Sequence, residues 1–134
     1  GGIGLNFLIK ISEVLIMKRP LAYITAHWGD CTEDNMKLAA KYCRSAYDAG
    51  YQPICPMMMH SLFLREAIPQ EHKDGLDMSK DYLYRSALLV VCGNAVDETM
   101  KNAIALAARF HKPATTLEGI LTVKGQGRRC PNGS

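Results

Sequence analysis

Two adjacent carboxylates, Asp97 and Glu98, follow a Gly93-Asn94 break in the chain. Carboxylates that open onto a ligand crevice can serve as general acid or general base. They also have a purely structural interpretation, because acidic residues in the first turn of a helix are stabilised by the helix dipole. The same charges weigh against a phosphate at this helix terminus. Asp97 and Glu98 are therefore the candidate catalytic residues, with helix capping as the alternative.

Two histidines and the single tryptophan lie where loops are expected. His27 and Trp28 follow an apolar run, and His60 follows Pro56 and the three methionines at positions 57–59. An imidazole can contact a nucleobase or a phosphate near neutral pH, although each histidine can equally be a polar loop residue. Trp28 either stacks on a nucleobase or covers core, and the methionines either fill core or line a flat ligand.

The element that positions the carboxylates runs from residue 87 to residue 117. The apolar, β-branched run 87–92 predicts a buried strand. Apolar residues at helical spacing then predict a helix whose buried face contains Met100, Ala103, Ile104 and Ala107. Residues 114–117 predict the next strand, which completes a parallel crossover. Ligands bind beyond the carboxyl ends of such strands, so we expect the site at residues 93–99.

The remaining elements are expected in the same alternation. Residues 21–26 predict a strand, and a helix with capping signals at Asp30 and Thr32 runs to about residue 49. Its buried face is expected to carry residues 36, 40, 43 and 47, and Gly50 ends it in the left-handed conformation. Further expectations are a strand at 51–55, a short helix at 61–67, a polar loop at 70–75, a helix at about 77–85, and an edge strand or short helix at 118–123. The pattern is α/β, a single Rossmann-like three-layer domain with a parallel sheet of four to five strands.

Composition limits the class of protein. A chain of 134 residues with net charge +3 fits one domain at residues 17–123, a tail at 124–134 and an N-terminal segment at 1–16. That segment is either an extension before the natural start of the domain or an amphipathic element that packs on a partner subunit. We expect no nucleic-acid or membrane partner, because basic residues are scattered and the apolar segment is too short to span a bilayer. The five cysteines lack paired spacing, which favours reduced thiols in the cytoplasm and no metal.

The chain resembles the nucleoside 2-deoxyribosyltransferase-like family of small Rossmann-like nucleotide-binding domains over about residues 20–117. The residues that carry the resemblance are Ala22–Ala26, Asn35, Ala49–Pro56, Gly75, Arg85–Gly93 and Thr99–Ala107. The resemblance implies a nucleoside or nucleotide ligand, homodimers or larger homo-oligomers, and cleavage or exchange of a glycosidic bond. A glutamate attacks the anomeric carbon in such enzymes, and an aspartate assists.

The chain departs from this family at its catalytic carboxylates. The nucleophile position falls on Ala103, the assisting aspartate falls near Ser79, and a further aspartate position falls on Ala87. Either the activity is lost, or nearby acids replace the missing groups, or position 103 carries a substitution. Three functions follow: a nucleotide-binding module, an N-glycosidase or deoxyribosyltransferase with a relocated carboxylate, or an oligomeric structural protein with a vestigial site. No cofactor is expected, and the candidate ligand-binding residues are Thr25, His27, Trp28, Asp30, Asn35, His60, Gly93, Asn94 and Met100.

Overall fold

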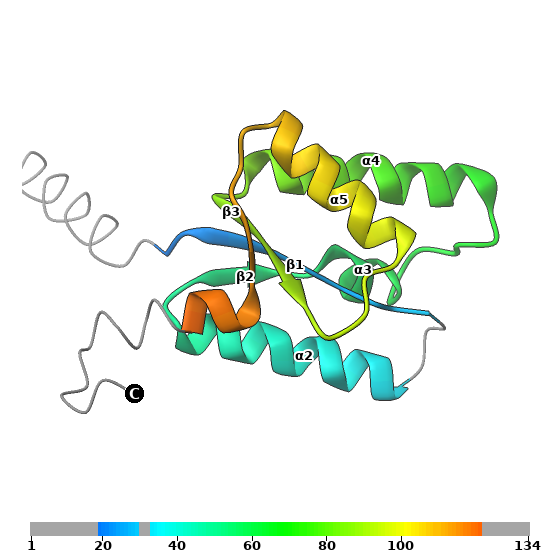
Figure 1. The fold of residues 1–134 in the computed structure, drawn as a ribbon. Coiled ribbons are helices and arrows are strands. Elements are labelled where there is room, and N and C mark those ends of the chain that lie inside the picture. Colours follow the sequence, from blue (N-terminus) through cyan, green and yellow to red (C-terminus); the bar gives the residue numbers. More distant parts are fainter. Residues whose placement is uncertain (1–18, 30–32, 122–134) are drawn as a thin grey trace, which may run out of the picture.

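The fold is a four-stranded parallel sheet covered by helices on both faces (Figure 1), which confirms the predicted α/β class. The computed structural model describes residues 19–29 and 33–121. The elements are β1 (Leu21–Ala26), α2 (Glu33–Asp48), β2 (Gln52–Ile54), α3 (Pro56–His60), α4 (Pro69–Arg85), β3 (Leu88–Cys92), α5 (Glu98–Arg109) and β4 (Ala114–Thr116). Residues 117–121 are also helical.

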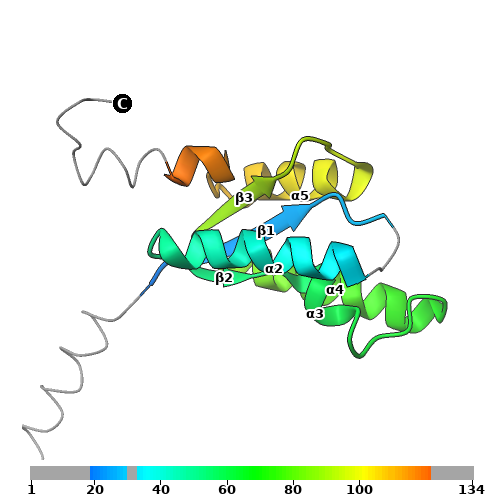
Figure 2. The ribbon, with the colours of Figure 1, turned by 90° about the horizontal axis from the view of Figure 1, so that it is seen from below.

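The two faces of the sheet have separate apolar cores. Because side chains alternate along a strand, Ala22 and Ile24 of β1 pack with Ala39 and Ala46 of α2 on one face. Tyr23 of β1 packs on the other face with residues of α4, β3 and α5. Figures 1 and 2 show α2 on one side of the sheet, and α4 and α5 on the other. The result is the predicted three-layer domain.

The strand order β2-β1-β3-β4 places β1 between two parallel neighbours. Residues 22–26 of β1 pair in register with residues 88–92 of β3. The chain leaves β1 toward α2 on one face and leaves β3 toward α5 on the other (Figure 2). The gap beyond the carboxyl ends of β1 and β3 is thus the topological switch point, where ligands bind in such sheets.

The segment between β2 and β3 differs from the sequence-based expectation. The short helix lies at Pro56–His60, and residues 61–67 form turns instead of the predicted helix. Residues 70–75 were expected as a polar loop, but they belong to the first half of α4. Pro69 begins this helix, since a proline in the first turn lacks only an N–H that has no helical partner. The polar residues are its solvent face, and Gly75 is buried against Leu64 and His60.

Smaller differences concern helix α2 and the last described residues. The buried face of α2 is centred on Ala39 and Ala46, whereas Ala40 and Tyr47 are exposed, so two residues of the predicted face were wrong, while Met36 and Cys43 are half-buried as predicted. Gly50 has φ 101°, as its role at the helix end requires. Residues 117–121 take the helical alternative of the two predicted for this region. The predicted N-terminal segment 1–16 and tail 124–134 lie outside the described residues, and no described helix could cross a membrane.

Candidate functional site

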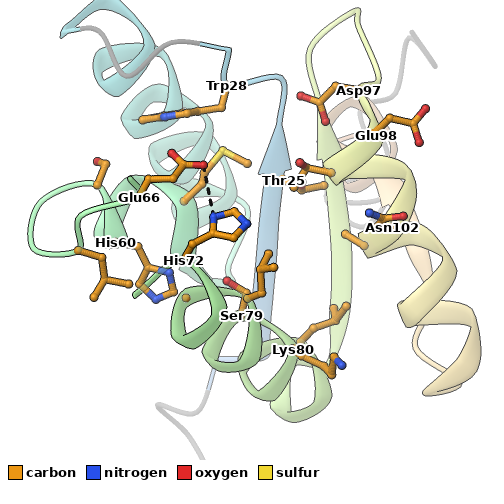
Figure 3. A pocket seen from close by; sticks show the side chains of 18 of the residues that line it. Thr25, Trp28, His60, Glu66, His72, Ser79, Lys80, Asp97, Glu98 and Asn102 are labelled. Carbon is orange, nitrogen blue, oxygen red and sulfur yellow. Dashed lines mark ion pairs between the residues drawn. The ribbon is translucent and has the colours of Figure 1, made fainter. Parts of the chain in front are cut away.

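A cavity of about 840 Å³ opens beside the switch point, between α4 and α5 and above β1 (Figure 3). This volume lies within the range of about 300–1,000 Å³ that is typical of small-molecule sites. Its lining is Tyr23, Thr25, His27, Trp28, Gly29, Met57, His60, Ser61, Leu64, Glu66, Glu71, His72, Gly75, Leu76, Ser79, Lys80, Leu83, Asp97, Glu98, Thr99, Asn102, Ala103 and Leu106. The loop after β1 thus contributes to one wall of the cavity, and the start of α5 contributes to another.

A hydrogen bond between His27 and Asp97 connects those two walls. His27 Nδ1 lies 2.9 Å from Asp97 Oδ2, and the other carboxylate oxygen accepts a 2.9 Å hydrogen bond from the backbone N–H of Met100. Asp97 is the N-cap of α5, so the second bond satisfies a helix-end donor. Burial acts to raise the pKa of Asp97, but hydrogen bonds from Met100, His27 and the backbone of Trp28 outweigh it and lower that pKa. The carboxylate of Asp97 is therefore ionised and is fixed in position by its hydrogen bonds.

The inner part of the cavity carries neutral groups. Thr25 and Ala103 are buried, and the phenol of Tyr23 shares a hydrogen bond with Ser79. Burial raises the pKa of Tyr23 to about 12, so this phenol is protonated at neutral pH. Ala103 and Ser79, the two positions that the expected resemblance assigns to catalytic carboxylates, both line the cavity. No carboxylate occupies either position.

The charged side chains lie around the opening. Four acidic residues line the cavity, and they are Glu66, Glu71, Asp97 and Glu98. Glu98 is 86% exposed and pairs with Lys101 at 3.4 Å, and its carboxylate extends away from Thr25 in Figure 3. Glu66 lies 3.7 Å from His72 Nδ1, and Lys80 is the single lysine of the lining. The opening therefore carries more negative than positive groups.

His60 has a different environment from His27. Its ring is buried between α3 and α4, with an edge-on contact to Phe63 at 5.7 Å and a tilted contact to Tyr82 at 6.2 Å between ring centroids. Burial lowers the pKa of His60, and its Nε2 atom is buried without a hydrogen-bond partner. His60 is thus a neutral packing residue that also contributes atoms to the cavity wall.

Most of the predicted site residues meet at this cavity. Thr25, His27, Trp28, His60, Asp97, Glu98 and Ala103 line it. Four others lie elsewhere: Met100 is fully buried in the core, Gly93 approaches Tyr42, Asn94 is exposed, and Asn35 donates to the carbonyl of Trp28 at 2.6 Å. Asp30 lies outside the described residues.

Of the wall that α4 provides, the sequence-based prediction named only Ser79, and it did not include the amide of Asn102. Glu71, His72, Gly75, Leu76, Ser79, Lys80 and Leu83 all reach the cavity from α4. The first four of these lie in the first half of α4, and Pro69 with an acidic residue, Glu71, in the first turn is a helix-start signal. Asn102 is exposed on α5 and is the neighbour of Ala103 in the chain. Hydrophobic periodicity marks the buried face of a helix, so it did not indicate this polar residue.

The described residues contain no group of three or more histidine, cysteine or acidic side chains that could hold a metal ion. The three described cysteines, Cys43, Cys55 and Cys92, are free thiols. Burial raises the pKa of Cys92 to about 12, which keeps this thiol protonated and unreactive. The candidate chemistry therefore rests on the His27–Asp97 pair and on the polar groups of the cavity.

Comparison with known proteins identifies a family for this chain. A family model described as a domain of unknown function (DUF7768) matches residues 20–117, which contain the sheet and every described residue of the cavity. No curated protein matches the chain.

Proposed function

The chain belongs to the family of a domain of unknown function (DUF7768), and from the geometry of its site we propose that it binds a nucleoside or nucleotide. The observation that carries this proposal is the cavity at the β1–β3 switch point, with Ala103 and Ser79 in its lining. These are the two positions at which the resembled deoxyribosyltransferases place carboxylates around the sugar. The proposed ligand site therefore coincides with the substrate site that the resemblance implies.

The polar and aromatic groups of the cavity support such a ligand. Trp28 is half-buried at the opening, opposite Asp97 in Figure 3, and offers a flat face for a nucleobase. The hydrogen bond from Asn35 to the Trp28 carbonyl holds this loop in place. The hydroxyl of Thr25 and the amide of Asn102 can fix the orientation of a sugar, because a small ligand site needs only a few placed polar groups.

Asp97 and Glu98, the two candidate catalytic carboxylates, are less suited to attack on the ligand. Both oxygens of Asp97 are engaged, and Glu98 extends toward Lys101 at the surface. A nucleophile needs an unengaged oxygen that faces the reacting atom. A glycosidase or transferase activity remains the second candidate function, and the His27–Asp97 pair is the observation that favours it.

We also propose a cytoplasmic protein that forms homo-oligomers. The free thiols of Cys43, Cys55 and Cys92 support a reducing compartment. Leu62 and Phe63, which are 71% and 60% exposed, are an apolar surface that a second subunit could cover. Light scattering after gel filtration measures the oligomeric state, and a monomer at all concentrations would contradict this part of the proposal.

The test of ligand binding is a thermal-shift and calorimetric titration with deoxynucleosides, ribonucleosides and their 5′-monophosphates. A ligand at 100 times its dissociation constant should stabilise the folded state by about 2.7 kcal/mol. Asn102→Ala should weaken binding, because this amide lines the cavity. Asn94→Ala is the matched control, since Asn94 is exposed but lies outside the lining. The absence of any shift with the whole panel, or equal losses in the two variants, would refute the proposal.

A further inference from the structure

We propose that His27, oriented by Asp97, is a general base that activates water to hydrolyse the N-glycosidic bond of the bound ligand. This inference rests on the proposed function, because it takes the ligand to be a nucleoside or nucleotide in the same cavity. It assigns the reaction to a histidine and a water molecule in place of a carboxylate nucleophile.

The geometry fixes one edge of the imidazole and leaves the other open. Asp97 is itself held, because Oδ1 accepts from Met100 while Oδ2 lies 2.9 Å from His27 Nδ1. The Nε2 edge faces Gly29, where an added Cβ would come within 3.5 Å of Nε2. Gly29 has φ 56° and no side chain, so no Cβ lies against this nitrogen. The side chain of His27 is 57% exposed and belongs to the cavity lining.

The charge of Asp97 selects the useful tautomer. An ionised carboxylate accepts hydrogen bonds only, so the proton of a neutral His27 resides on Nδ1. Nε2 then carries a lone pair that can take a proton from water. A carboxylate that orients a histidine in this way also stabilises the imidazolium that forms during the reaction.

The charges around the opening favour glycosidic cleavage. Glycosidic cleavage passes through an oxocarbenium-like transition state, which carries positive charge on the sugar. Four acidic residues and one lysine line the cavity, so their net negative charge favours the positive charge that develops on the sugar. The buried methyl group of Ala103 offers no nucleophile, and the proposal gives that role to water.

The proposed reaction is a single displacement. Water loses a proton to Nε2 of His27, and its oxygen forms a bond with the anomeric carbon. The bond from that carbon to the base nitrogen breaks, and its electron pair leaves with the base. The departing base nitrogen takes up a proton from solvent and the His27 imidazolium releases its proton to solvent, which gives a free sugar and a free nucleobase and restores the enzyme.

The experiment measures free base by reversed-phase chromatography after incubation with deoxynucleosides and their 5′-monophosphates. His27→Asn keeps a donor near Asp97 but removes the base, so kcat should fall about 10²–10⁴-fold. The dissociation constant should stay within about threefold, and added imidazole should restore part of the activity. His111→Asn is the control: His111 is exposed outside the cavity with φ 58°, a conformation that Asn tolerates, and its activity should be unchanged.

A second variant tests Asp97 as a positioning residue. Asp97→Asn preserves a helix cap, since Asn and Asp cap about equally well. It removes the charge that sets the tautomer, so kcat should fall while KM changes little, and the pH profile of kcat should shift. Binding without base release by the native protein, or full activity in His27→Asn, would overturn this inference and leave the binding proposal intact. A protein that binds no member of the panel would overturn both.

Discussion

Two substitutions of Asp97 should distinguish how much its helix cap and its contact with His27 each contribute to the free energy of unfolding. Asp97→Ala removes the cap of α5 and the pair with His27. Loss of an N-cap costs about 1 kcal/mol, and a partly exposed ion pair contributes about 0.5 kcal/mol. The free energy of unfolding should therefore fall by about 1.5 kcal/mol in Asp97→Ala. Asp97→Asn keeps the cap, so its loss should be limited to about 0.5 kcal/mol.

Urea unfolding followed by circular dichroism at pH 7 measures these differences, and the Asn variant is the internal control. Combining each variant with His27→Ala gives a double-mutant cycle for the pair. His27→Ala should lower the free energy of unfolding more in the native protein than in the Asp97→Ala variant, because that variant already lacks the partner carboxylate. Equal losses in the Ala and Asn variants would refute the capping role, and exact additivity with His27→Ala would refute the pairing.

The free energy of unfolding should also depend on the charge of Asp97 in acid. The pKa of Asp97 is lowered in the folded protein by its hydrogen bonds, so the unfolded chain binds this proton more readily. The stabilisation by Asp97 is fully present above its unfolded pKa and is lost as the pH falls through the folded pKa. Asp97→Asn should therefore flatten the loss of stability in acid. Parallel curves for the two proteins, measured by urea unfolding from pH 2 to pH 6, would contradict this.

Three further predictions concern other residues of the cavity and core. In the His27→Asn background, Ala103→Glu should restore base release and Ala103→Gln should not, because only the carboxylate can attack; equal chromatograms would oppose the family alignment. Burial lowers the pKa of His60, so the unfolded chain binds this proton more readily; stability should rise with pH from 5 to 7 and His60→Gln should flatten that rise in urea titrations. Leu83 is 1% exposed, and Leu83→Ala should lower the urea midpoint by an amount equivalent to about 2–4 kcal/mol; a loss below about 1 kcal/mol would contradict its place in the core.

The sequence was most informative where hydrophobic periodicity and capping agreed. The run 87–92 predicted β3, which begins one residue later at Leu88, and the helical spacing predicted the buried face of α5, on which Met100, Ala103 and Ala107 are buried and Ile104 is half-buried. Parallel strands are buried on both faces, so their sequences are continuous apolar runs that stand out. The buried helix face repeats every three or four residues and stands out equally. These elements place the switch point, which is why most candidate residues proved to line one cavity.

The sequence was least informative for α4. Its first half is polar because it faces solvent, and the buried Gly75 resembles a loop residue when only propensity is considered. The close approach of Leu64 and His60 to Gly75 is a tertiary contact, and a Cβ there would meet Leu64 Cδ1 at 3.2 Å. Such a contact between distant residues has no local signal. Apart from Ser79, the wall that α4 gives to the cavity was therefore absent from the prediction.

Asp97 can cap a helix and orient a histidine at the same time, because each of its two carboxylate oxygens has its own partner. Oδ1 accepts from Met100, and this bond holds the carboxylate at the start of α5. Oδ2 remains for His27, which the loop after β1 brings from the other side of the switch point. Capping thus reduces the freedom of the carboxylate without using the oxygen that orients the imidazole. A helix cap that also fixes a histidine gives this site a rigid acceptor, and a rigid acceptor is what a general base requires of its partner.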